Sequence, residues 1–146
     1  MKKHPSAPWL AADVYGRSLP SFTVSLLVHD VPRSVAFYTQ VLAARVHYAD
    51  VDFAALEVSG TAFMLHADHT YDHHAWYPEL SSGVRRGLGA ELRLRGPDPE
   101  EVARRAASFG ATVLKPPTVT KHGWHEVIVG DPDGYAWAVG VSTLPA

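Results

Sequence analysis

Short apolar stretches and amphipathic stretches follow one another along the first half of this chain in a definite order. Residues 22–28 are rich in β-branched and apolar side chains and predict a strand. The next segment predicts a helix, because Asp30 can cap its start and the apolar residues of 31–42 recur on one helical face. Further strands are predicted at residues 45–48, 53–58 and 61–66. The first half therefore indicates one strand, one helix and three more strands.

The same order returns in the second half. Residues 91–95 alternate between polar and apolar side chains and predict a strand with one polar face. Asp98 and Pro99 are typical of a helix start, and Gly110 is typical of a left-handed helix end. Strands are predicted at residues 112–114, 126–129 and 135–141, and the last two are joined by a type I turn at residues 131–134.

The repeat predicts an α+β fold built from two βαβββ modules. Each half is too small to bury its own helix, so the halves should pack into one domain or exchange between chains. The predicted boundaries are an N-terminal arm at 1–20, module one at about 21–68, a linker at about 69–88 and module two at about 89–143, within a single domain at 21–146. The arm is expected to be loosely structured, with Trp9 and Leu10 as its anchor.

Composition and charge narrow the function classes. The chain has 146 residues and a net charge of -2, from 13 basic and 15 acidic residues without a basic stripe, which argues against a nucleic-acid partner. It has no apolar stretch that could span a bilayer, and the first residues lack the apolar region of a secretory signal. The absence of cysteine excludes disulfides and thiolate metal sites, and it fits a cytoplasmic protein. We therefore expect a cytoplasmic protein with no membrane partner.

Two segments carry a resemblance to a known family. They are SLLVHDVPRSVAFYTQVL at residues 25–42 and HGWHEVIVGDPDGYAWAV at residues 122–139. With them, residues 22–142 resemble the glyoxalase/bleomycin-resistance/dioxygenase superfamily, also called the vicinal-oxygen-chelate (VOC) superfamily. The resemblance implies that the two modules form a curved mixed sheet around a small-molecule cavity, and that the chain is a homodimer. The family usually has glycine where this chain has Ala43, so the first helix is expected to end differently.

The resemblance also implies where a metal would be bound. In metal-dependent members the ligands occupy four strand positions, which here hold Thr23, Met64, Glu91 and Ala138. Catalytic zinc needs about three protein ligands, and hard divalent ions prefer carboxylate-rich sites. Glu91 alone offers a good ligand, so we expect no metal at the usual place and no cofactor.

Strand alternation then predicts which side chains face the cavity. If Thr23 and Glu91 face it, Ser25 and Arg93 face it as well. The predicted ligand-binding residues are Thr23, Ser25, Met64, His66, Glu91 and Arg93, with Trp76 and Trp124 in neighbouring segments where they can close over a ligand. This set suits an organic ligand with a polar or charged end. Glu91 and Arg93 equally fit an outward-facing, ion-paired strand face, and the pattern leaves both interpretations open.

Histidines are concentrated at positions 66, 69, 73 and 74. On a helix, His69 and His73 would share one face and could hold a metal, but the polar residues between them favour a loop. His66 is the better functional candidate, as an inward-facing group that titrates near neutrality.

Three functions fit these observations. The first is a metal-independent protein, similar to bleomycin-resistance proteins, that sequesters an organic ligand or antibiotic and orients it through Glu91 and Arg93. The second is an enzyme of the superfamily, a lyase, isomerase or dioxygenase, with Glu91 or His66 as the catalytic acid/base group or as a metal ligand. The third is an interaction module with a vestigial cavity. Metal content and ligand binding would separate them.

Overall fold

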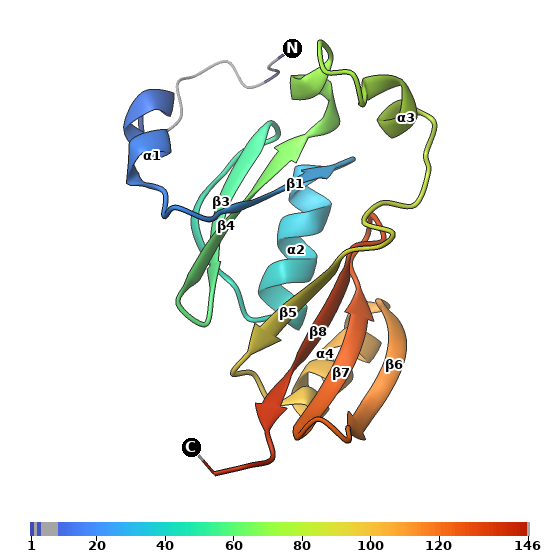
Figure 1. The fold of residues 1–146 in the computed structure, drawn as a ribbon. Helices are drawn as coiled ribbons and strands as arrows, with labels where there is room; N and C mark the ends of the chain where they lie inside the picture. Colours follow the sequence, from blue (N-terminus) through green and yellow to red (C-terminus); the bar gives the residue numbers. More distant parts are fainter. Residues whose placement is uncertain (2, 4–8, 146) are drawn as a thin grey trace. The chain divides into compact units, whose positions relative to one another are not determined.

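The structure, a computed structural model, describes residues 1, 3 and 9–145. Its elements, in chain order, are α1 (Ala12–Ser18), β1 (Val24–Val28), α2 (Val31–Val41), β2 (Arg45–Ala49), β3 (Phe53–Val58), β4 (Thr61–Ala67), the 3₁₀ helix η1 (Asp68–Tyr71), α3 (Tyr77–Ser81), β5 (Glu91–Arg95), α4 (Pro99–Phe109), β6 (Thr112–Val119), β7 (Trp124–Gly130) and β8 (Ala136–Ser142) (Figure 1). None of the described helices has the length and apolar character that crossing a membrane requires.

The chain forms two compact units. The first contains the residues up to 35 together with 45–84, and the second contains 36–44 together with the residues from 85 onward. Each unit holds a four-stranded mixed sheet, with strand order β1-β4-β3-β2 in the first and β5-β8-β7-β6 in the second. In each sheet the opening strand runs parallel to its neighbour and the other pairs are antiparallel. The predicted α+β class and the two βαβββ modules are confirmed.

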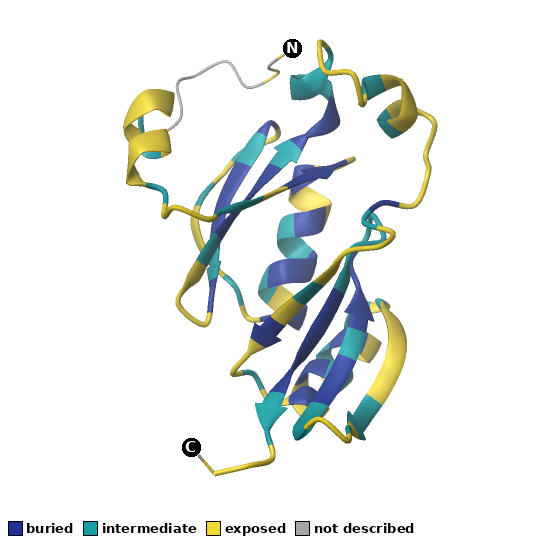
Figure 2. Ribbon diagram, in the orientation of Figure 1, coloured by how far each residue is buried: buried dark blue, intermediate teal, exposed yellow. Residues whose placement is uncertain are grey.

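The first sheet has one densely buried face. Figure 2 shows buried residues along β3 and β4 in dark blue. Val28, Leu56 and Leu65 are completely buried, because alternate side chains of each strand share a face and the apolar ones lie together on it. The opposite face carries Ser25 and His66, whose side chains are hydrogen-bonded to each other (Oγ to Nδ1, 2.8 Å). The candidate site lies on this opposite face of the first sheet.

The second unit is organised around α4. Asp98 caps this helix by accepting a hydrogen bond from the Glu100 amide at 3.0 Å, and Gly110 ends it with φ of 81°. Val102 and Ala106 are completely buried on the helix face that packs on β6 and β7. The sheet edge, β6, extends to Val119 beyond the predicted end at 114, and its Pro116–Pro117 pair is tolerated because an edge strand lacks a partner on one side.

The turn between β7 and β8 connects to a buried polar group. Asp131 Oδ1 accepts the amides of Asp133, Gly134 and Tyr135, each at 2.9 Å. Its Oδ2 accepts the hydroxyl of Tyr38, from the part of α2 that belongs to this unit, at 2.6 Å. Burial raises the pKa of Asp131, and burial with the neighbouring carboxylate raises the pKa of Tyr38. The family-like turn sequence therefore has a structural role here.

The structure corrects one expectation about the end of α2 and adds a helix to the N-terminal arm. Ala43 does adopt the left-handed conformation, with φ of 55°, so the helix ends as a glycine-terminated helix would, at the cost of local backbone strain. Within residues 1–20, expected to be loosely structured, residues 12–18 form α1. Its Asp13–Arg17 ion pair (2.7 Å) supports the helix.

Candidate ligand-binding site

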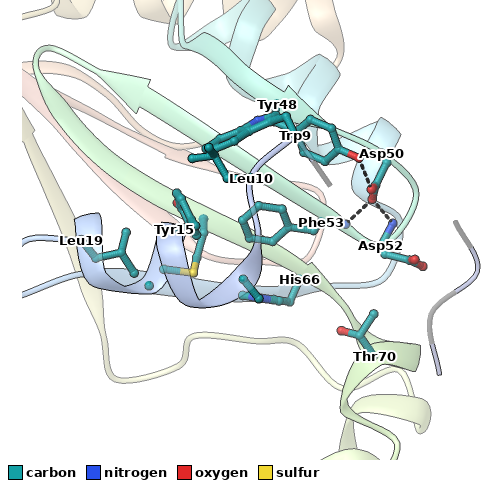
Figure 3. A pocket seen from close by; sticks show the side chains of 13 residues that line it. Trp9, Leu10, Tyr15, Leu19, Tyr48, Asp50, Asp52, Phe53, His66 and Thr70 are labelled. Carbon is teal, nitrogen blue, oxygen red and sulfur yellow. Dashed lines mark hydrogen bonds between the residues drawn. The ribbon is translucent and has the colours of Figure 1, made fainter. Parts of the chain in front are cut away.

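A pocket lies in the first unit between α1 and the face of the first sheet that carries Ser25 and His66. Its volume is about 320 Å³. Residues from the N-terminal segment, β2, β3, β4 and η1 line it: Trp9, Leu10, Ala12, Tyr15, Gly16, Leu19, Tyr48, Asp50, Asp52, Phe53, Met64, His66 and Thr70 (Figure 3). The pocket exists because the sheet turns a partly apolar face outward and α1 covers it.

Four aromatic rings form a closed circuit around this pocket. Trp9 meets Tyr15 and Tyr48 edge to face, with ring centroids 5.5 and 5.8 Å apart. Phe53 meets Tyr15 edge to face at 5.5 Å and lies 6.4 Å from Tyr48. Such pairs contribute about 0.5–1.5 kcal/mol each beyond the area they bury. They hold α1, none of whose residues is fully buried, against the sheet.

Two carboxylates stand at one end of the pocket (Figure 3). Asp50 Oδ1 accepts the amides of Asp52 and Phe53 at 2.7 and 2.8 Å, which shapes the turn between β2 and β3. Its Oδ2 accepts the Tyr48 hydroxyl at 2.6 Å, and this hydrogen bond raises the pKa of Tyr48 to about 12. Asp50 is therefore fixed in place, and Tyr48 stays protonated.

The second carboxylate, Asp52, is buried at the same end. It accepts the Lys3 amide with both oxygens, at 2.8 and 2.9 Å, and its Oδ1 lies 2.6 Å from His69 Nε2. These partners offset the cost of removing the carboxylate from water.

His66 and Met64 form the sheet side of the pocket. They lie two residues apart on β4 and so share a face, and the His66 ring packs 5.0 Å from that of Phe53, its partner across β3 and β4. Burial lowers the pKa of His66. At neutral pH the pocket wall therefore presents an uncharged imidazole.

Of the ligand-binding residues predicted in the first module and the linker, some line the pocket and others lie away from it. Met64 and His66 line the pocket, and Ser25 supports His66 from the same face. Thr23 lies just before β1 and donates its hydroxyl to the Pro20 carbonyl at 3.2 Å, away from the pocket lining. Trp76 is 56% exposed and packs on His74, with ring centroids 4.6 Å apart.

The predicted second-module residues form an ion-paired sheet face. Arg93 binds Glu91 and Glu126, each at 2.5 Å, and Glu126 is buried while Arg93 and Glu91 are about half exposed. Arg95 lies over the Trp124 ring at 5.4 Å, a cation–π contact. These residues belong to the second unit, and none lines the pocket of the first.

Sequence reasoning did not identify most of the aromatic and acidic lining. Trp9 was identified as an anchor of the arm, but its partners Tyr15, Tyr48 and Phe53 were not assigned to a site. The one readable signal for α1 was the spacing of Asp13 and Arg17, four residues apart. Asp50 and Asp52 lie in a turn where carboxylates are common, so their type alone indicated nothing.

The donor set does not fit the metal that many family members use. At the four family positions, Thr23 is engaged with a backbone carbonyl, Met64 is an apolar wall residue, Glu91 pairs with Arg93 and Ala138 has no donor. Among the residues that the structure describes, no three or more histidine and acidic side chains gather as metal ligands. In the histidine-rich tract, His69 pairs with Asp52 and His73 with Asp72 (3.4 Å).

Comparison with known proteins establishes the family. Residues 21–139 match the model of the Glyoxalase/Bleomycin resistance protein/Dioxygenase superfamily, and the chain belongs to this superfamily. No curated protein sequence matches it.

Solved structures share the fold at low sequence identity. A glyoxalase/bleomycin resistance protein/dioxygenase family enzyme from Burkholderia phytofirmans PsJN has 20% identity and a TM-score of 0.66, over 82% of this chain and 96% of that chain. TioX from Micromonospora sp. ML1 has 19% identity and a TM-score of 0.61, over 83% and 97%. Lactoylglutathione lyase from Agrobacterium tumefaciens has 14% identity and a TM-score of 0.60, over 85% and 96%. These likenesses concern the fold.

Proposed function

We propose that this protein binds and sequesters a small organic ligand in the pocket between α1 and the first sheet, as a metal-independent member of its superfamily. The observation that carries the proposal is the lining itself: an aromatic and aliphatic surface with a few polar groups at one end. Pockets of this kind bury most of an organic ligand and orient it by those polar groups. The volume of about 320 Å³ suits a molecule of one or two rings.

A ligand panel with two α1 variants tests this proposal. Tyr15 lines the pocket, whereas Val14 lies beside it in the same helix, is 46% exposed and does not line the pocket. A compound that raises the melting temperature should bind Tyr15→Ala about tenfold more weakly, because one aromatic contact is lost. It should bind Val14→Ala as it binds the unchanged protein. Failure of every compound, or equal binding by Tyr15→Ala, would contradict the proposal.

His66 supports a second candidate, an enzyme that uses it as a general base. Its lowered pKa keeps the imidazole neutral at pH 7, which is the form that accepts a proton, and it stands in the pocket wall. In this case His66→Gln abolishes turnover of a pocket ligand while binding persists. If ligands leave the pocket chemically unchanged, sequestration stands and catalysis is rejected. Glu91, the other catalytic candidate, would act from the second unit, where its partner is Arg93.

A further inference from the structure

The charged side chains among the described residues that line the pocket have a single sign. Of the residues that line it, Asp50 and Asp52 carry a formal charge, and the described lining contains no lysine or arginine. Burial disfavours the cationic form of His66, so this side chain adds no positive charge at neutral pH. The lining therefore gives the end of the pocket at Asp50 and Asp52 a net negative formal charge, part of which His69 and the Lys3 amide offset at Asp52, and an anionic ligand would be disfavoured there.

The aromatic lining adds to this potential. Trp9, Tyr15, Tyr48 and Phe53 surround one space, and ring faces carry partial negative charge that attracts cations. Tyr48 links the two features, because its ring belongs to the aromatic circuit while its hydroxyl binds Asp50 at 2.6 Å. Leu19 lies away from the carboxylates and makes that part of the lining apolar (Figure 3), and Met64 adds a second apolar side chain to the lining.

We propose that the pocket selects an amphiphilic organic cation, with a protonated or quaternary amine held by the aromatic rings near Asp50 and Asp52 and an apolar body on Leu19 and Met64. This inference rests on the proposed ligand-binding function and specifies the chemical class of its ligand. The cationic head is attracted both by the ring faces and by the two carboxylates, which a neutral molecule of the same shape is not.

Part of the pocket lining lies on a segment outside the family match. Six of the thirteen lining residues precede residue 21, where the match begins: Trp9, Leu10, Ala12, Tyr15, Gly16 and Leu19. Two of the four aromatic rings are among them. A segment outside the paired modules thus completes the pocket, whereas Asp50 and Asp52, which carry the negative charge, lie within the family match.

Three phenyl compounds of similar size test the charge preference. Phenyltrimethylammonium is the cation, tert-butylbenzene is its neutral isostere with carbon in place of nitrogen, and benzoate is an anion. Isothermal titration calorimetry on the full chain at pH 7.5 and low salt gives each Kd. The cation should bind roughly tenfold more tightly than the isostere, benzoate should bind most weakly, and added salt should weaken the cation alone.

Two conservative variants locate the preference. Asp50→Asn keeps an oxygen that can accept the two turn amides but removes the charge, and it should reduce the cation's affinity about tenfold with little effect on the isostere. Asp13→Asn removes the same charge from an exposed carboxylate of α1 outside the lining, and it should change neither affinity by more than about twofold. Circular dichroism checks that both variants keep the fold, and Asp52→Asn replaces Asp50→Asn if that variant does not.

Each result decides between the two proposals. A tenfold preference for the cation that Asp50→Asn removes and Asp13→Asn preserves supports the inference. Equal or tighter binding of the isostere or of benzoate overturns the cation preference and leaves ligand binding intact. Binding of none of the three overturns the cation preference as well, while the function itself then depends on the wider ligand panel and on Tyr15→Ala.

Discussion

The two sheets share a strand order but differ in what they present on corresponding faces. On the first, Phe53 pairs with His66 across β3 and β4, and α1 covers a pocket. At the same places on the second sheet, Glu126 pairs with Gly140 across β7 and β8, and the face carries ion pairs with Arg93. The strand register shows that these places correspond, because His66 pairs with a residue near the end of β1 and Gly140 pairs with the residue at the end of β5.

The comparison shows that the repeated backbone supplies positions, while side chains and an added segment supply chemistry. A glycine and a buried glutamate give a face held by ion pairs, whereas an imidazole, a phenyl ring and a covering helix enclose a volume. Fold alone therefore does not decide which module forms a pocket.

Removing residues 1–20 should have the largest effect on ligand affinity. It removes α1, so the pocket face of the first sheet becomes as uncovered as the corresponding face of the second sheet. The truncated chain loses Trp9 and Tyr15, and contacts of this size contribute about 1.5–3 kcal/mol each. The affinity of a pocket ligand measured by calorimetry should fall at least about a hundredfold. Unchanged affinity in a chain that still unfolds cooperatively would place the ligand elsewhere.

Giving the second face a side chain at Gly140 should reduce stability. A Cβ there would lie 2.1 Å from the His125 carbonyl oxygen and 2.8 Å from the Glu126 Cα, and backbone atoms cannot easily move. Gly140→Ala should cost about 2–3 kcal/mol and lower the melting temperature by roughly 5–10 °C. The control Gly16→Ala, in α1, meets nothing within 4 Å and should leave stability unchanged or slightly higher. Equal melting temperatures for the two variants would show that β7 and β8 are less closely packed than the structure has them.

Breaking the charge pair of the second face should have a smaller effect. Arg93→Ala leaves the buried Glu126 carboxylate without its cation, and the cost should be about 1 kcal/mol because Arg93 itself is half exposed. Adding Glu126→Gln should restore part of this loss, measured as a double-mutant cycle in urea. Glu91→Gln, which removes an exposed partner of Arg93, should stay within about 0.5 kcal/mol. Additive losses in the cycle would mean that Arg93 and Glu126 do not interact.

The imidazole of the first face should produce the smallest effect, a pH dependence. Because burial lowers the pKa of His66 in the folded state, the unfolded state binds the proton more readily. Stability should thus be complete above the ordinary histidine pKa and decline as the pH falls through it toward the lower folded value. His66→Gln should flatten this part of a melting-temperature profile from pH 7.5 to 5, and a profile identical to that of the unchanged chain would assign the decline to other groups.

The fold could be predicted from sequence because its signals are local. Cap residues, turn residues and apolar periodicity are each visible within a few positions, and they gave every strand of both sheets, though β6 was expected five residues shorter. Alternation also placed Ser25, Met64 and His66 on one face. The aromatic circuit could not be found this way, because it joins Trp9 and Tyr15 to residues more than 30 positions away, and only the tertiary fold sets that proximity.

About half of the pocket lining lies on one contiguous N-terminal stretch, so this part of the lining can vary without a change in the core of the domain. The buried faces of both sheets lie among residues that the family model matches, so they can be retained while the stretch before residue 21 changes. Related chains could therefore acquire new ligands by exchanging a single short terminal segment, without redesigning a core. In recombination or protein engineering, that segment would be the natural cassette to swap.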